Sequence, residues 1–367
     1  MKILLNKYLI SIFFVLGVLC SQSSIYNFVS LNSFISIGND SNPLRLSKNE
    51  ISEIADRPYL LGKASTVESQ FFQYNFSLKF FSKKGLLSRL FYNKKTIFDL
   101  SFSDKTHFSN KSKSGYNINF KIDQQLGNYR HLYFSYFIMP SFYLREYEDL
   151  DYVVGLDDMH YNAYRSAYFD IQKMRLSYGS YDNNKVSKMK FGISYERQLF
   201  DKYFTEFDLN ISGFFAQINF NHNDKQIMFY FSHEDANNFR YLDGSFSTIN
   251  ADRSFTQSRI KFSYKEPFNK SLNKLIEENP FLKDTNRGII VDSYYRYSTS
   301  DIESDKLHYK RSHHDLTMTY WSKVGNHKIS LSKRIRTTSS PESWVEELKT
   351  FKRYILTYTF YFDKIRL

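Results

Sequence analysis

Residues 116–123 read Tyr-Asn-Ile-Asn-Phe-Lys-Ile-Asp, so every even-numbered position is apolar or aromatic and every odd-numbered one is an amide or charged. Successive side chains of a β-strand point to opposite faces of the sheet. The segment is therefore predicted to be a strand with one apolar face and one polar face. A soluble β-sandwich also contains such strands, so the fold class depends on how often the pattern recurs.

The alternation recurs along nearly the whole chain, whereas a helical period of 3.6 is almost absent. Gly213 marks a change of phase within one of the segments, where a β-bulge is expected. The pattern predicts an all-β chain of about 14 strands, with about 12 to 16 as the range because strand boundaries are hard to fix from sequence. The expected strands cover residues 29–37, 72–80, 98–103, 116–123, 132–138, 174–178, 189–195, 207–220, 227–231, 260–264, 291–297, 316–320, 329–331 and 354–362.

The connections between these strands alternate between short and long. Short turns rich in Gly, Asn and Asp are expected at 125–128, 181–185, 221–225 and 324–326. Longer polar connections fall between them, at 104–114, 144–165, 235–254, 300–313 and 338–350. This asymmetry is typical of a membrane barrel, which has short periplasmic turns and longer extracellular loops. The tight link at 201–202 departs from it and is interpreted as a short outer hairpin.

Composition agrees with strands rather than helices in a membrane. Aromatic residues make up 19% of the chain, yet the mean hydropathy is −0.50 and 24% of residues are charged. Helical membrane spans would raise the mean hydropathy, so a helical membrane protein is excluded. The formal charge of +12 does not imply nucleic-acid binding in an exported protein. We expect that charge to be spread over the lumen, the loops and the membrane rims.

Residues 1–23 are interpreted as a signal peptide, which leaves 24–367 as one barrel domain. Lys2 and Lys7 precede an apolar run from Leu9 to Leu19, which is too short to cross a bilayer as a helix. Cys20 is the single cysteine and lies at the boundary of that run, so no disulfide is expected. The predicted location is therefore outside the cytoplasm.

Two segments do not follow the strand pattern. Residues 38–65 are irregular and are interpreted as an outer loop or an inward-folded plug. Residues 266–287 are interpreted as a periplasmic linker that contains a short amphipathic helix ending before Pro280.

The export signal, the alternating strands, the loop asymmetry and the aromatic last strand together resemble bacterial outer-membrane β-barrels as a class. The resemblance covers nearly the whole mature chain. It implies a transmembrane antiparallel up-and-down barrel in the bacterial outer membrane, in contact with outer-membrane lipid and lipopolysaccharide. The strand 354–362 is similar to the C-terminal signal that the barrel-assembly machinery recognises, although five residues follow Phe362. Residues 42–47 resemble the Asn-Pro-Ala segment of FadL-type fatty-acid transporters, without its small residue after proline.

The polar faces of the strands supply candidate pore-lining residues of both signs. Facing rows of opposite charge would pair and brace the lumen, whereas a net basic constriction would favour anionic solutes. Both interpretations remain open from sequence. The candidates are Lys79, Asp99, Lys121, Asp123, Lys188, Lys190, Glu206, Asp208, Arg259, Lys261, Asp292 and Arg296.

No catalytic motif, cofactor site or metal site is expected. His308, His313 and His314 form the densest group of imidazoles, but adjacent strand residues face opposite ways and His313 and His314 cannot share one ion if extended. We interpret all three as solvated loop histidines. The acidic stretch 148–160 is interpreted as a solvated loop rather than a calcium site or a protease centre.

Three functions follow from these features. The first is a porin-like channel for small solutes, which would prefer anions if its constriction is net basic. The second is a FadL-like conduit for hydrophobic compounds, in which residues 38–65 act as a hatch. The third is a closed structural or surface-interaction barrel that uses 144–165 and 235–254 as contact loops.

Overall fold

The computed structural model describes residues 26–82, 94–148, 164–181, 187–202, 204–222, 224–239, 252–268, 286–301 and 305–366. Within these ranges, 14 antiparallel strands follow one another around a closed barrel. The barrel closes because β14 pairs with β1, from Phe34 opposite Tyr361 to Asp40 opposite Ile355. The predicted fold class and strand number are confirmed.

Each strand pairs only with its sequence neighbours, apart from the closing pair and the short β15. The strands are β1 Tyr26–Asp40, β2 Ser69–Ser82, β3 Thr96–His107, β4 Gly115–Gln125, β5 Arg130–Glu148, β6 Tyr164–Tyr181, β7 Ser187–Phe200, β8 Leu209–His222, β9 Lys225–Asn238, β10 Phe255–Pro267, β11 Asn286–Thr299, β12 Arg311–Val324, β13 His327–Ser339, β14 Phe351–Tyr361 and β15 Ile365–Arg366.

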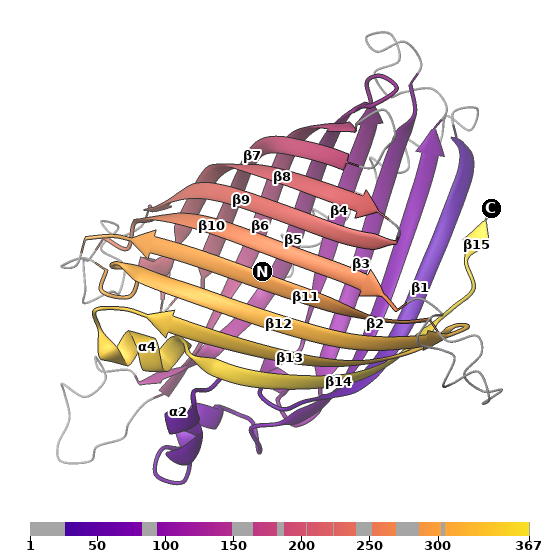
Figure 1. Ribbon diagram of the computed structural model, residues 1–367. Helices are drawn as coiled ribbons and strands as arrows, with labels where there is room; N and C mark the ends of the chain where they lie inside the picture. Colours follow the sequence, from indigo (N-terminus) through magenta and orange to yellow (C-terminus); the bar gives the residue numbers. More distant parts are fainter. Residues whose placement is uncertain are drawn as a thin grey trace.

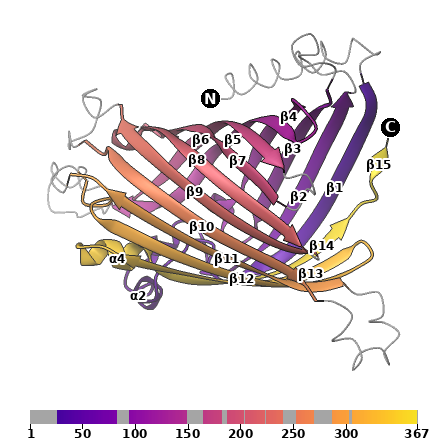
Figure 2. The same ribbon diagram turned by 45° about the horizontal axis from the view of Figure 1, so that its top comes forward.

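The two ends of the barrel differ. One end, here called the turn end, carries the start of β1, the end of β14 and the tight β8–β9 and β12–β13 turns. The opposite, loop end carries the short helices, which both views place away from β15 (Figures 1 and 2). By the usual asymmetry of such barrels, the turn end faces the periplasm. The helices are α2 Lys48–Ser52, η1 Pro58–Leu61, η2 Lys111–Lys113, η4 Thr205–Phe207 and α4 Ser343–Lys349.

The outer face of the wall is apolar. On β7, the side chains of Met189, Phe191 and Ile193 are 57–62% exposed, while Lys190 between them faces the interior and approaches the ring of Tyr133. Leaving so many large apolar side chains in water would be unfavourable, whereas lipid removes that cost. A closed barrel with an apolar outer belt and a polar interior is the transmembrane form. The chain is thus an outer-membrane β-barrel. No helix in the described ranges is long and apolar enough to cross a bilayer.

The C-terminal residues continue the seam of the barrel. After β14 ends at Tyr361, the amide of Phe362 donates to the carbonyl of Ser33, and β15 then pairs Ile365 with Leu31. The register moves by one residue between β14 and β15, as in a β-bulge. The residues that follow Phe362 thereby cover part of β1 that would otherwise present an unpaired edge.

The β-bulge predicted at Gly213 is wrong. β8 pairs with β7 and β9 without a register shift, so Leu209 and Ile211 face the interior together with Gly213. They pack with Ala236 and Phe255 in a buried apolar cluster. The apolar face of this strand therefore changes from the interior to lipid without a bulge. Gly213 is needed for another reason, since a Cβ there would lie 2.2 Å from the His233 carbonyl oxygen.

The segment predicted to be irregular begins and ends later than expected, because residues 38–40 still belong to β1 and β2 begins at Ser69. Between them, Ser47 and Glu50 form a capping box at the start of α2. Glu50 also binds Arg145 of β5, with Nη1 and Oε1 2.7 Å apart. The short link at 201–202 is longer than predicted and runs from 201 to 208, with η4 inside it. The signal peptide, the acidic residues 149–158 and the helix expected near 270–278 lie outside the described residues.

Candidate functional site

The interior of the barrel contains a first cavity towards the turn end, with a volume of about 390 Å³. Charged residues from β2, β3, β4, β6 and β7 line it, and Lys79 pairs with Asp99 across 3.3 Å. The two side chains remain 40% and 21% exposed, so water reaches this pair. Among the predicted pore-lining residues, this turn-end cavity brings together Lys79, Asp99, Lys121, Asp123 and Lys190.

The other predicted pore-lining residues are distributed around the wall. Lys188 donates to the hydroxyl of Tyr181 at 2.6 Å, and Lys261 pairs with Asp292 across 3.2 Å. Arg259 and Arg296 line a second cavity, described below. Asp208 and Glu206 do not lie on a strand, because η4 occupies that stretch. Asp208 is buried and its Oδ1 accepts from the amide of Phe200, so it fixes the link between β7 and β8.

A basic stripe follows the inward face of the last strands. Asp315 of β12 accepts from Arg334 at 3.1 Å and from Arg336 at 2.7 and 3.0 Å. Arg353 of β14 donates to both carboxylate oxygens of Asp40. Nε donates to Oδ1 at 2.7 Å, and Nη2 donates to Oδ2. Buried carboxylates therefore hold three guanidinium groups in fixed orientations.

The first loop adds Arg45 to this stripe. Asn42 closes the turn, since its side chain donates to the Leu46 carbonyl at 2.8 Å and accepts from the Leu46 amide at 2.9 Å. Arg45 takes a φ of 62° within the turn. Burial, with the positive charges of Arg334, Arg353 and Arg336, lowers the pKa of Arg45 to about 9. Residues 42–47, which resemble the FadL-type segment, thus place the guanidinium of Arg45 near the lumenal arginines.

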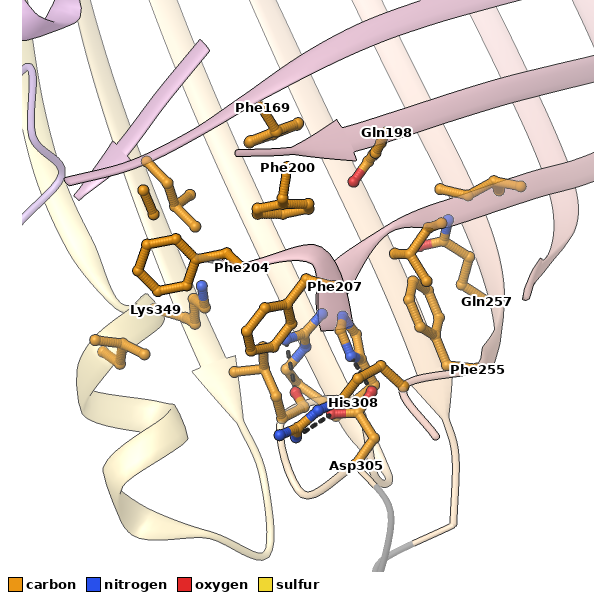
Figure 3. A pocket seen from close by; sticks show the side chains of 18 of the residues that line it. Phe169, Gln198, Phe200, Phe204, Phe207, Phe255, Gln257, Asp305, His308 and Lys349 are labelled. Atoms are coloured by element: carbon orange, nitrogen blue, oxygen red, sulfur yellow. Dashed lines mark hydrogen bonds and ion pairs between the residues drawn. The ribbon is translucent and has the colours of Figure 1, made fainter. Parts of the chain in front are cut away.

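A second and larger cavity, of about 520 Å³, lies towards the loop end. Residues of β5 to β8 and of β10 to β13 form its wall, and η4, the 305–310 loop and α4 cover it (Figure 3). Its apolar wall consists mainly of rings, with Phe169 and Phe200 stacked 4.7 Å apart and Phe207 5.7 Å from Phe200. Phe204 and Phe255 also line this loop-end cavity.

Its polar lining is strongly basic. Asp305 is the single carboxylate among the lining residues, against six basic side chains. Three of these are paired: Arg253 lies 4.0 Å from Asp305, Arg259 binds Glu234 at 2.6 Å, and Arg336 binds Asp315. The six are Arg253, Arg259, Arg296, Arg311, Arg336 and Lys349.

The remaining three basic side chains have no carboxylate partner among the residues that the structure describes. Arg311 donates from Nη1 to the Leu307 carbonyl at 2.6 Å. Arg296 has a buried Nε without a hydrogen-bond partner. Burial lowers the pKa of Lys349, at the end of α4, well below its usual value, and the charges of Arg145, Arg311 and Arg296 lower it further.

The interpretation of the three histidines as solvated loop residues is wrong for two of them. His313 faces the interior and is 1% exposed, while His308 stacks on Phe255 at 3.8 Å and contacts Asp305. Burial lowers the pKa of His308 well below its usual value. Only His314, on the opposite face of β12, is exposed. Within the described ranges, no group of three His, Cys, Asp or Glu residues is placed to hold a metal ion.

Sequence reasoning missed most of the loop-end cavity. Phe200 and Phe255 lie at strand ends, outside the alternating stretches, and Phe204 follows the link that looked like a tight hairpin. Phe207 was expected to begin the strand 207–220, whereas it belongs to η4. One signal was present: Leu209 and Ile211 are out of phase with the lipid-facing residues further along β8. Such a change without a bulge indicates an apolar surface inside the barrel.

No protein-family profile and no curated protein matches this chain. Solved barrel structures align with most of it at low identity. The outer membrane channel DcaP of Acinetobacter baumannii is 8% identical over 91% of this chain and 97% of its own, with a TM-score of 0.46. An anion-selective porin from Comamonas acidovorans is 6% identical over 92% and 99%, with a TM-score of 0.42. OprD of Pseudomonas aeruginosa is 7% identical over 94% and 96%, with a TM-score of 0.35. At these values the likeness does not extend to a transported solute.

Proposed function

We propose that the barrel is a channel for small solutes and that it prefers anions. One observation carries the proposal: both interior cavities are lined by more basic than acidic side chains. The loop-end cavity has six basic residues against Asp305. The turn-end cavity has Lys79, Lys121, Arg175 and Lys190 against Asp99 and Asp123. An excess of one charge inside a low-dielectric wall raises the local concentration of the opposite ion.

Pairing reduces this excess without removing it. Lys79 is neutralised by Asp99 and Arg336 by Asp315, and such pairs support the alternative that charges only brace the barrel. Lys121 and Arg175 have no carboxylate partner in the part of the chain that the structure describes, although both line the turn-end cavity. Unpaired cations at both ends favour a path for anions over simple bracing.

Ion current through the folded protein tests the proposal. We expect the purified full-length barrel to give stepwise conductance in planar bilayers, with a reversal potential in a KCl gradient that shows chloride to be more permeant than potassium. Silence from protein whose folding is verified by its heat-modifiable gel mobility would contradict the channel. A cation-selective current would contradict only the anion preference.

Charge reversal inside and outside the lumen sharpens this test. The double change Lys188→Glu and Lys190→Glu is expected to shift the reversal potential towards cation selectivity, because both side chains point inward beside Tyr133. Lys225→Glu is the matched control, since Lys225 lies at the turn-end rim, 49% exposed and paired with Glu266. Equal shifts in the two variants would mean that Lys188 and Lys190 do not lie beside the ion path.

A further inference from the structure

We propose that the loop-end cavity is a binding site for a small organic acid with an aromatic body. Its carboxylate would lie between Arg296 and Lys349, and its ring against Phe200 and Phe207. The site lies on a transport path only if the proposed passage of anions holds, and to that extent the inference rests on the proposed function. Binding of the acid in the cavity is a separate property and is tested separately.

The size and the wall of the cavity fit such a ligand. A volume of about 520 Å³ is within the usual range of about 300–1,000 Å³ for small-molecule sites. Phe169 and Phe200 are stacked at 4.7 Å with 17° between their planes, and Phe207 extends this surface. Aromatic rings prefer offset-stacked or edge-to-face neighbours at centroid distances of about 4.5–7 Å. A further ring can join this cluster in the same way.

The unpaired cations define where the acid group lies. Arg253, Arg259 and Arg336 are already engaged by Asp305, Glu234 and Asp315. A buried donor that lacks a partner is unfavourable, and Nε of Arg296 is such a donor in a side chain that also has no carboxylate partner among the described residues. Figure 3 shows Lys349 directed from α4 towards the side of the cavity that holds Phe204 and Phe207. A bound carboxylate would compensate both groups.

The aromatic wall and the basic lining together restrict the class of ligand. A small inorganic anion such as phosphate would satisfy the cations but leave the phenylalanine surface uncovered. A neutral aromatic compound would cover the rings and leave the guanidinium of Arg296 without a counter-charge. An ion pair in a largely apolar site is stronger than in water, so both parts of the ligand contribute.

Equilibrium binding to the full-length barrel, folded in detergent micelles, tests the site without any measurement of current. Isothermal titration calorimetry would compare 3-phenylpropanoate with its neutral amide, with 3-cyclohexylpropanoate and with inorganic phosphate. We expect 3-phenylpropanoate to bind saturably. The amide should bind about ten- to a hundredfold more weakly than the acid, because it cannot form charge-assisted hydrogen bonds. Equal binding of acid and amide would overturn the anion site. Equal binding of the phenyl and cyclohexyl acids would overturn the aromatic specificity.

Variants then locate the ligand. Arg296→Gln and Lys349→Gln are each expected to weaken 3-phenylpropanoate about tenfold and to leave the amide unchanged. Phe207→Ala should weaken the acid and the amide alike. Lys190→Gln, in the turn-end cavity, is the matched control and should bind as the wild type does. Unchanged binding in folded Arg296→Gln and Phe207→Ala would place the ligand elsewhere and overturn the proposal.

The two proposals fail in different ways. Loss of binding with normal currents would remove the organic-acid site and leave the channel. Binding with no current in any folded sample would keep the site and remove the channel. The acid–amide comparison in wild-type protein remains informative even where a variant does not fold.

Discussion

The two cavities of the lumen are built from the inward faces of adjoining strands, yet they use charge differently. At the turn end, Lys79 and Asp99 pair across 3.3 Å while both remain partly exposed to water. At the loop end, Asp315 is 5% exposed and holds two arginines, and Arg296 has a buried Nε without a hydrogen-bond partner and no carboxylate partner among the described residues. At the loop end, the buried ion pairs therefore contribute more to the free energy of unfolding, and the basic side chains without a carboxylate partner can bind an anionic ligand.

Removal of a central carboxylate should give the largest contrast between the cavities. Asp315→Ala leaves Arg334 and Arg336 without their shared acceptor in a buried setting, so we expect a loss of about 3–5 kcal/mol in the free energy of unfolding. Asp99→Ala breaks a hydrated pair and a hydrogen bond of 3.1 Å from Ser77, and should cost about 1 kcal/mol. Denaturant unfolding from lipid vesicles measures both values.

Similar losses in the two variants would remove the distinction between a buried and a hydrated half of the lumen. Refolding of each variant into the same vesicles is the control, because the comparison requires reversible unfolding.

The outer surface of the barrel was predictable from sequence, whereas the loop-end cavity was not. In residues 116–123 and 189–195 the alternation separates a lipid-facing side from a polar side. It does so because each lipid-facing position of a strand has to be apolar whatever its neighbours are. Leu209 and Ile211 alternate as lipid-facing residues do but face the interior, and apolar alternation does not distinguish lipid from an apolar cavity. Lys349 and Arg296 line the same cavity although α4 and β11 are separated in the sequence by two further strands. Local patterns carry no information on such contacts across the lumen.

Acidification should strengthen binding of organic anions at the loop end. Burial raises the pKa of Asp305 to about 6, although the positive charges of Arg253 and Arg311 and the amides of Leu307 and His308 act in the opposite direction. Asp305 is therefore ionised at pH 7 and mostly protonated at pH 5, where the cavity loses its single lining carboxylate. We expect affinity for 3-phenylpropanesulfonate, which stays ionised, to rise about three- to tenfold from pH 7 to pH 5.

The Asp305→Asn variant is the control for this effect. It should bind the sulfonate at pH 7 about as tightly as the wild type does at pH 5, with a smaller remaining dependence due to Lys349. The same raised pKa has a consequence for stability: the folded state binds the proton more tightly, so this group's contribution falls as pH rises from about 4 to about 6. Full retention of the pH dependence in Asp305→Asn would show that another group titrates.

The smallest effect should be the direct coupling between Lys79 and Asp99. A double-mutant cycle with Lys79→Ala and Asp99→Ala isolates the pair from other consequences of each change. Because the two side chains are 40% and 21% exposed, we expect a coupling of about 0.2–1 kcal/mol that decreases in high salt. The matched cycle on Arg336 and Asp315, which are 14% and 5% exposed, should give a larger coupling that salt changes little. A salt-insensitive coupling at Lys79 and Asp99 would mean that the turn-end cavity excludes water, in which case its cations would brace the wall instead of attracting anions.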